Sequence, residues 1–235
     1  MKKITNFLLI AVLSAFNLGA ETETGSNYSI TSDFTYVSEY VSRGIGVTEA
    51  SIQPSIEFSA EGFYITAWTN QPLTNNSVSD EFDFFVGYSW SLDDSSSLDV
   101  GAITYYFPKV ESSNSSIEPY IGFSIDTFFG LGSSTYLYYD VILDVSTFQF
   151  DLSYSVEMTD SLTLDLGGNY GIVAVLDGDQ DYKDYTYHGF SGVISYAFND
   201  KVVPYMGIAY SNRNIKNVKE DFVYYIFGIT VGFVD

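Results

Sequence analysis

Apolar and polar residues alternate with a period of two along most of this chain. In the stretch FQFDLSYSVEMTDSLTLDL, residues 148–166, Phe148 and Phe150 fall on one face of the pattern, and Gln149 and Asp151 fall on the other. Successive side chains of a β-strand point to opposite faces, whereas a helical pattern repeats about every 3.6 residues. The alternation therefore predicts strands that are apolar on one face and polar on the other.

The alternation predicts twelve antiparallel strands. We expect them at residues 28–41, 51–59, 63–70, 81–90, 97–107, 116–126, 134–143, 147–158, 161–176, 185–198, 202–211 and 222–234. Short turns are expected at one end of these strands, and longer polar loops, such as Gly44–Ala50 and Asn212–Asp221, at the other. An even number of strands with this alternation of connections is typical of bacterial outer-membrane barrels.

A soluble β-sandwich is the alternative, since each of its sheets also buries one face. Many of the predicted strands have about ten residues or more, whereas strands of globular proteins most often have about 5–6. Their apolar faces are rich in Phe, Leu and Tyr, and the opposite faces carry Gly, Ser, Thr and acids. Lipid accepts such a face and leaves no strand edge unpaired. We therefore predict an all-β fold, a transmembrane antiparallel up-and-down β-barrel of about twelve strands.

Aromatic residues near strand ends are expected to form girdles at the two membrane interfaces. The candidates are Tyr28, Tyr40, Trp90, Tyr210 and Tyr225. The final predicted strand, rich in aromatic residues, resembles the C-terminal strand that the outer-membrane assembly machinery reads. The expected partners are therefore the lipid bilayer and that machinery.

The N-terminus has the features of a signal peptide. Lys2-Lys3 precede an apolar run at residues 7–16, and Asn17-Leu18-Gly19-Ala20 follow. A membrane-spanning helix takes about 20 apolar residues, so this run is too short for one, although an N-terminal anchor is the alternative. We expect residues 1–20 to be a signal peptide and residues 21–235 to form one barrel domain in the outer membrane.

The charge balance is strongly acidic. The chain has 30 acidic residues against 9 Lys and Arg, a net charge of −21 and no cysteine. Disulfides and thiolate metal sites are excluded, and nucleic-acid binding is disfavoured because phosphate contacts need basic side chains. By strand parity, many acids point inward, and rings of acids in a lumen favour cations. The inward acids are Asp33, Glu39, Glu57, Asp83, Asp99, Glu118, Asp140, Asp151 and Asp165.

Two further features bear on whether the lumen is open. Arg43 also points inward, so it is a candidate to pair with lumen acids and pin the first loop; the alternative is a solvated rim charge. Bulky aromatic side chains on the inward faces would narrow the bore. These are Tyr64, Trp68, Tyr120, Tyr136 and Tyr138.

No catalytic residue or cofactor is expected. His188 is the single histidine, and Ser191 follows it at odd spacing, which places the two side chains on opposite faces. Asp177, Asp179 and Asp181 have a spacing that can offer oxygens to Ca²⁺, but Tyr182 stands where an EF-hand needs Gly. A solvated acidic loop is the simpler interpretation, with weak divalent-cation binding as the alternative.

Four stretches in the N-terminal half resemble a family of uncharacterised proteobacterial envelope proteins of the Gcw_chp type. They are SEYVSRGI, QPSIEFSAEGFYITAWTN, EFDFFVGYSW and LDVGAITYYFP, in this order. The resemblance implies an outer-membrane barrel of unknown function and supplies no catalytic residues. Arg43 and Gly44 belong to its most recognisable motif.

The sequence thus predicts a narrow barrel with a negative interior, whose activity is the passive passage of small cations or polar solutes. The alternative is a non-conducting structural or binding barrel whose outer loops contact a partner. Twelve strands lie between filled eight-stranded barrels and open porins, so strand number does not decide between the two.

Overall fold

The structure is a computed structural model that describes residues 28–74, 80–111, 114–127, 131–176, 183–215 and 218–233. The predicted signal peptide at residues 1–20 and the acids Asp177, Asp179 and Asp181 lie outside the described residues. Among the described residues, no helix is long and apolar enough to cross a bilayer.

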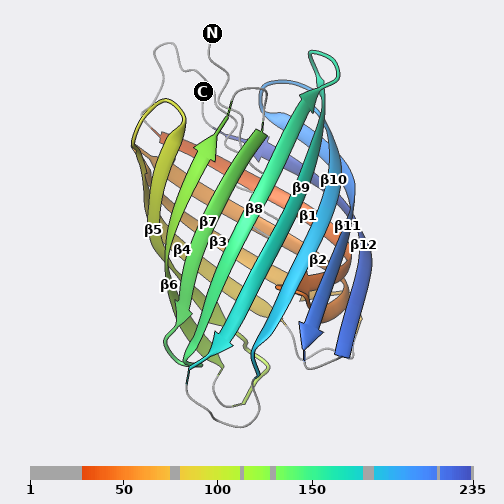
Figure 1. Cartoon of the computed structure of the whole chain (residues 1–235). Coiled ribbons are helices and arrows are strands. Elements are labelled where there is room, and N and C mark those ends of the chain that lie inside the picture. Colours follow the sequence, from red (N-terminus) through yellow and green to blue (C-terminus); the bar gives the residue numbers. More distant parts are fainter. Residues whose placement is uncertain are drawn as a thin grey trace.

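Twelve antiparallel strands form a closed barrel, as predicted (Figure 1). Each strand pairs with the next in sequence, and β1 closes the barrel by pairing with β12. The strands are β1 (Tyr28–Ser42), β2 (Ile45–Ala60), β3 (Phe63–Pro72), β4 (Glu81–Ser91), β5 (Ser96–Tyr106), β6 (Ser115–Asp126), β7 (Leu131–Asp140), β8 (Val145–Glu157), β9 (Leu162–Val175), β10 (Tyr185–Tyr196), β11 (Val202–Ile215) and β12 (Val218–Gly232).

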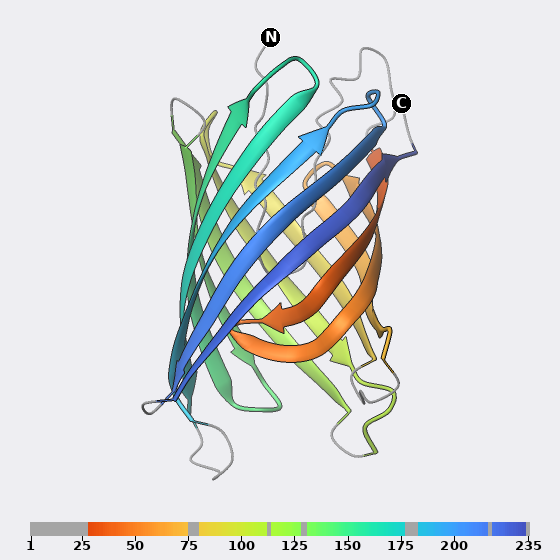
Figure 2. The same ribbon diagram turned by 90° about the vertical axis from the view of Figure 1, so that its right-hand side faces the viewer.

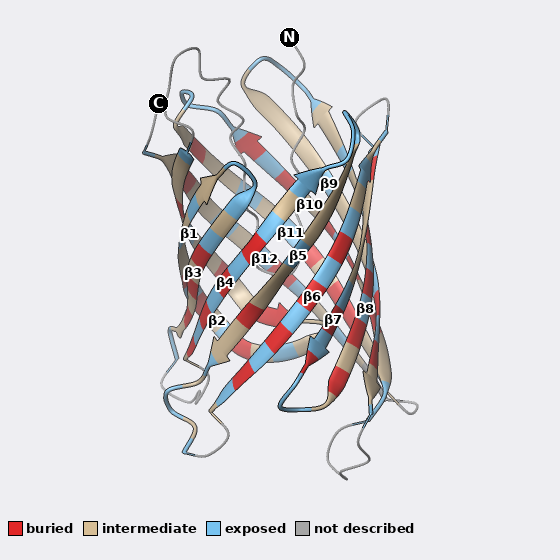
Figure 3. Ribbon diagram, turned by 90° about the vertical axis from the view of Figure 1, so that its left-hand side faces the viewer, coloured by how far each residue is buried: buried red, intermediate tan, exposed pale blue. Residues whose placement is uncertain are grey.

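Exposure alternates along the strands, and bands of exposed and buried residues cross the wall (Figure 3). Leu152 is 45% exposed and its neighbour Asp151 is 8% exposed. Large apolar side chains such as Phe84, Ile121 and Phe190 cover the outer face. An outer face of this kind, on a sheet with no free edge, is what a lipid bilayer requires.

Two of the predicted long loops are wrong, because the strands extend further than the alternation indicated. Residues 45–50 belong to β2, and only Arg43 and Gly44, with φ of 48° and 78°, turn the chain between β1 and β2. Two positive φ angles are the signature of a tight type I′ hairpin, for which a glycine at the second position is suited. Most of Asn212–Asp221 likewise lies in β11 and β12.

The predicted strand at 134–143 is displaced along the chain, since β7 ends at Asp140. The Asp140 carboxylate accepts hydrogen bonds from the backbone N–H groups of Ile142 (3.0 Å) and Leu143 (2.8 Å). A side chain that caps the next N–H groups in this way stabilises a turn rather than a strand. The apolar residues 141–143 therefore sit in the turn to β8.

Tyrosine rings on the inner face lie over glycines of the neighbouring strand. In each pair the two residues stand directly opposite in the register, and a Cβ added to the glycine would collide with the ring. Glycine is thus required here for close approach, and the ring covers the backbone that the glycine leaves bare. The pairs are Gly87–Tyr64, Gly101–Tyr120, Gly122–Tyr136, Gly171–Tyr187 and Gly228–Tyr205.

The β1–β2 hairpin leaves the wall before it reaches its tip. The pairing of β1 with β12 ends at Val37, and the pairing of β2 with β3 begins at Ser51, whereas the two strands stay paired with each other as far as Ser42 and Ile45. In Figure 2 both strands curve away from the steep run of β12. We call residues 38–50 the inner hairpin, because its side chains meet the interior of the barrel.

The inner hairpin corrects the prediction for one girdle residue. Tyr40 is 5% exposed, and its ring lies 5.6 Å from that of Trp68, an inward-facing residue of β3. The register of β1 and β2 shifts between Tyr40 and Val41, so simple alternation no longer gives the direction of the side chain. Tyr28, Trp90 and Tyr225 are 44–54% exposed on the outer face.

Candidate functional site: the barrel interior

The predicted inward acids occur in two groups along the barrel. Positions near the short-turn ends of the strands hold Glu57, Asp99 and Asp165, with Asp33 a little further in. Positions near the opposite end hold Asp83, Glu118 and Asp140, which are 4%, 1% and 6% exposed. Asp151 lies in the middle of β8, and Glu39 lies on the inner hairpin near Tyr224.

Neutral donors, rather than basic side chains, hydrogen-bond the first group of acids. Asp33 accepts from Thr35, from Thr230 (2.8 Å) and from the hydroxyl of Tyr205 (2.8 Å). Thr66 donates to Glu57 (2.9 Å), and Ser155 donates to Asp165. Such bonds satisfy the carboxylate oxygens but bring no basic side chain to offset their charge.

Asp99 is the centre of a tyrosine cluster. Tyr64 donates to it at 2.9 Å and Tyr136 at 3.2 Å, and the hydroxyl of Tyr120 bonds that of Tyr64. Tyr136 stacks on Tyr138, with ring centroids 5.7 Å apart. The aromatic residues that were predicted to narrow the bore are therefore brought together on the inner wall formed by β3 to β7.

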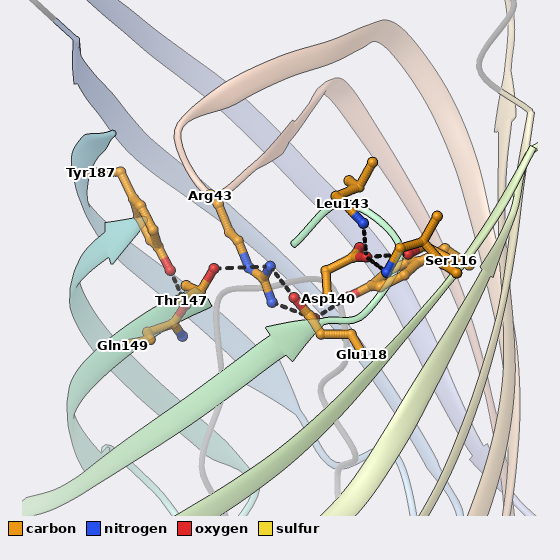
Figure 4. Close-up of polar contacts among 10 residues, drawn as sticks. Arg43, Ser116, Glu118, Asp140, Leu143, Thr147, Gln149 and Tyr187 are labelled. Atoms are coloured by element: carbon orange, nitrogen blue, oxygen red, sulfur yellow. Dashed lines mark hydrogen bonds and ion pairs between the residues drawn. The ribbon is translucent and has the colours of Figure 1, made fainter. Parts of the chain in front are cut away.

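Arg43 reaches across the lumen from the tip of the inner hairpin (Figure 4). Its two terminal nitrogens donate to the two carboxylate oxygens of Glu118 on β6, both at 2.7 Å. Thr147 of β8 accepts a third hydrogen bond at 3.3 Å, and the guanidinium lies 4.8 Å from the ring centroid of Tyr138. Since β6 to β8 lie opposite β1 in the strand order, the hairpin spans the interior.

Further contacts complete the surroundings of the hairpin tip. Tyr105 donates to Glu118 at 2.7 Å. A Cβ built on Gly44 would lie 2.8 Å from the Cβ of Tyr187 and 3.1 Å from that of Arg213, so the tip also touches β10 and β11. Tyr187 donates to Gln149, and Gln149 donates to Asp151 at 3.0 Å.

Apolar packing holds the rest of the inner hairpin. Its side chains join a buried cluster with the inner wall, and this part of the interior is filled by protein. At this level, side chains of the inner hairpin and of the wall occupy the interior, which narrows the lumen as the inward aromatic residues predicted. The cluster consists of Val37, Tyr40, Trp68, Phe85, Ile103, Tyr120 and Tyr138, with Val47 packed against it.

Several interior residues were not predicted. Glu81 is 5% exposed and hydrogen-bonds Tyr40, and it shares strand parity with Asp83, which could have revealed it. Arg213 is a second inward arginine; it pairs with Glu220 and lies 5.6 Å from the ring of Tyr185. It was missed because β11 was predicted to end before it.

The side chains considered for metal binding or catalysis are not brought together in the part of the chain that the structure describes. Within these residues, no three His, Asp or Glu side chains lie close enough together to hold a metal ion. His188 packs beside Phe190, which is 60% exposed on the outer face, whereas Ser191 is buried on the inner face. The two side chains are therefore separated by the wall.

The chain belongs to the family described as bacterial protein of unknown function (Gcw_chp), whose model matches residues 21–190. Among solved structures it is similar to KdgM porin, with a TM-score of 0.58 and 14% identity over 86% of this chain and 99% of that chain. It is similar to NanC porin, with a TM-score of 0.55 and 16% identity over 87% and 98% of the two chains.

A third similar structure is an outer-membrane channel from Pseudomonas putida F1, with a TM-score of 0.54 and 8% identity over 88% of this chain and 96% of that chain. No curated protein matches the chain. The fold that these structures share with it is that of outer-membrane porins and channels, in line with the predicted outer-membrane location.

Proposed function

We propose that the protein is an outer-membrane channel that admits small cations and other small polar solutes through a narrow, negatively charged interior. One observation carries the proposal: both arginines of the chain lie inside the barrel and are each paired with a carboxylate, while Asp33, Asp99, Asp151 and Asp165 are hydrogen-bonded by neutral side chains. Asp33, Asp99, Asp151 and Asp165 thus keep an uncompensated negative charge, which concentrates cations along a confined path.

We also propose how the chain is exported, where its domain begins and how it enters the membrane. Residues 1–20 act as a signal peptide, residues 21–235 form the barrel domain, and the outer-membrane assembly machinery inserts it. The protein is not an enzyme, which agrees with the porin fold and with the separation of His188 from Ser191 by the wall.

A non-conducting barrel is the second candidate. The observation that favours it is the inner hairpin, which packs against the opposite wall and fills part of the interior. In that case the barrel would serve as a scaffold for its outer loops. The two candidates differ in whether ions cross the folded protein.

Conductance measurements in planar bilayers distinguish the channel from the non-conducting barrel. We expect small stepwise conductances that favour cations, and replacement of Asp99, Asp151 and Asp165 by Asn should reduce this preference in the folded protein. The matched control replaces Asp94, Asp160 and Asp200, which are exposed in the short turns, and removes the same charge. Correctly folded protein that gives no steps would overturn the channel proposal, and an equal effect of both triple variants would show that the interior acids do not set the preference.

A further inference from the structure

The contacts of Arg43 have the composition of a site for a guanidinium group. Both oxygens of Glu118 accept from it in the planar fork geometry that guanidinium matches and ammonium does not. Thr147 takes a third N–H, and the face of Tyr138 supplies a cation–π contact. Apart from Arg43, every member of this group belongs to the barrel wall.

Contacts within the wall hold these groups in place beside the hairpin. Tyr105 of β5 fixes Glu118 through its hydroxyl, and Tyr138 is stacked on Tyr136 of the same strand. Thr147 stands directly opposite Tyr138 in the register of β7 and β8. The site is therefore preformed, so its ligand bears little of the ordering cost.

Glu118 makes an empty site unfavourable. The residue is 1% exposed, and a buried carboxylate that loses its cation is strongly destabilised. Movement of the hairpin tip away from the wall removes this cation, and a second cation that takes the place of Arg43 would restore the pairing.

We propose that Glu118, Tyr105, Tyr138 and Thr147 form a guanidinium-binding site, and that Arg43 is its tethered ligand. A solute that carries a guanidinium group competes with the hairpin tip for this site, and the hairpin narrows the lumen as long as Arg43 occupies it. The inference deepens the proposed function, on which it rests, because the solute must reach the site through the lumen.

The test removes the guanidinium group of Arg43 from the site and supplies a free guanidinium ion from solution. Arg43→Asn leaves an Asn-Gly turn, the dipeptide that a type I′ hairpin favours, so the hairpin should still fold while its tip loses the cation. We expect methylguanidinium to raise the melting temperature of this variant saturably, and methylammonium to do so at a concentration about tenfold higher or more, because it lacks the bidentate fork. In planar bilayers the variant should conduct several-fold more than the wild type, because its hairpin tip is no longer held at Glu118.

Two variants serve as controls. Adding Glu118→Gln to Arg43→Asn should raise the half-saturating concentration of methylguanidinium about tenfold or more. The melting temperature of Arg213→Ala should respond only weakly to methylguanidinium, because the partner residue Glu220 is 38% exposed and remains solvated. If Arg43→Asn does not fold, Arg43→Gly suits the same positive φ and replaces it.

The outcomes separate this inference from the channel proposal. Conductance without saturable stabilisation by methylguanidinium, or equal stabilisation with and without Glu118, overturns the guanidinium site and leaves the channel. Glu118-dependent stabilisation in electrically silent variants supports the site and overturns the channel.

Discussion

At the scale of single residues, tyrosine has two structural roles inside the barrel. Its ring covers the bare backbone of a glycine on the next strand, as Tyr120 covers Gly101, and its hydroxyl donates to a carboxylate, as Tyr64 donates to Asp99. An acidic interior with few basic side chains is thereby hydrogen-bonded without being neutralised.

The Gly–Tyr pairs predict a position-specific cost for alanine. A Cβ at Gly101 would overlap the Tyr120 ring and lie 2.6 Å from the carbonyl oxygen of Val86, so ring and strand must both move. We expect Gly101→Ala to lower the free energy of unfolding by about 1–3 kcal/mol, the usual cost of overpacking. Urea unfolding in lipid vesicles measures it.

Gly192→Ala is the matched control for this prediction. A Cβ at Gly192 meets only the Leu166 side chain at 3.6 Å, an ordinary contact. It should therefore change the unfolding free energy little. Equal costs at both positions would mean that the ring of Tyr120 does not need the glycine.

At the scale of strands, alternation decides which side chain meets lipid. Leu152 is 45% exposed on the outer face, while Ser153 points inward between Gly132 and Gly167 of the flanking strands. We expect Leu152→Arg to destabilise the barrel by about 2–4 kcal/mol if the site lies near mid-bilayer, and Ser153→Arg to cost less. If unfolding in lipid vesicles showed a larger loss of stability for Ser153→Arg than for Leu152→Arg, the assigned faces would be wrong.

The alternation was also enough to predict all twelve strands and the direction of most side chains. It could not predict the inner hairpin. The pattern continues through residues 38–50, but whether a hairpin stays in the wall depends on its pairing with neighbouring strands. Here neither β12 nor β3 pairs with these residues. Strand parity predicted the inward direction of Arg43 and made pairing with a lumen acid one of two interpretations, whereas the identity of that acid, Glu118, required the fold.

Cysteine pairs test where the hairpin tip lies, and the chain has no native cysteine to interfere. A Cβ on Gly44 would lie 3.1 Å from that of Arg213, slightly closer than the about 3.5–4.5 Å of disulfides. A side chain at Gly44 must shift slightly to clear the Cβ of Tyr187, 2.8 Å away, and we expect Gly44→Cys with Arg213→Cys to cross-link after mild oxidation in vesicles, as seen by gel mobility. Gly44→Cys with Ser195→Cys, near the other end of the barrel, should stay reduced. A cross-link in the control pair alone would place the tip elsewhere.

At the scale of the whole molecule, the barrel keeps its charge inside and its apolar surface outside. The outer face carries Phe, Leu and Ile side chains, and the interior carries carboxylates, tyrosines and two paired arginines. The inner hairpin divides the acids into one group on the short-turn side and another around its own tip. Ions that cross the barrel must pass through the part of the lumen that the inner hairpin does not fill.

The reversal potential across a salt gradient in planar bilayers tests the central claim most directly. The account predicts cation selectivity at low salt, and a weaker selectivity at high salt, because the screening length falls from about 10 Å at 0.1 M to about 3 Å at 1 M. Anion selectivity, or a cation selectivity that does not change with salt, would contradict a channel whose preference is set by the carboxylates of its interior.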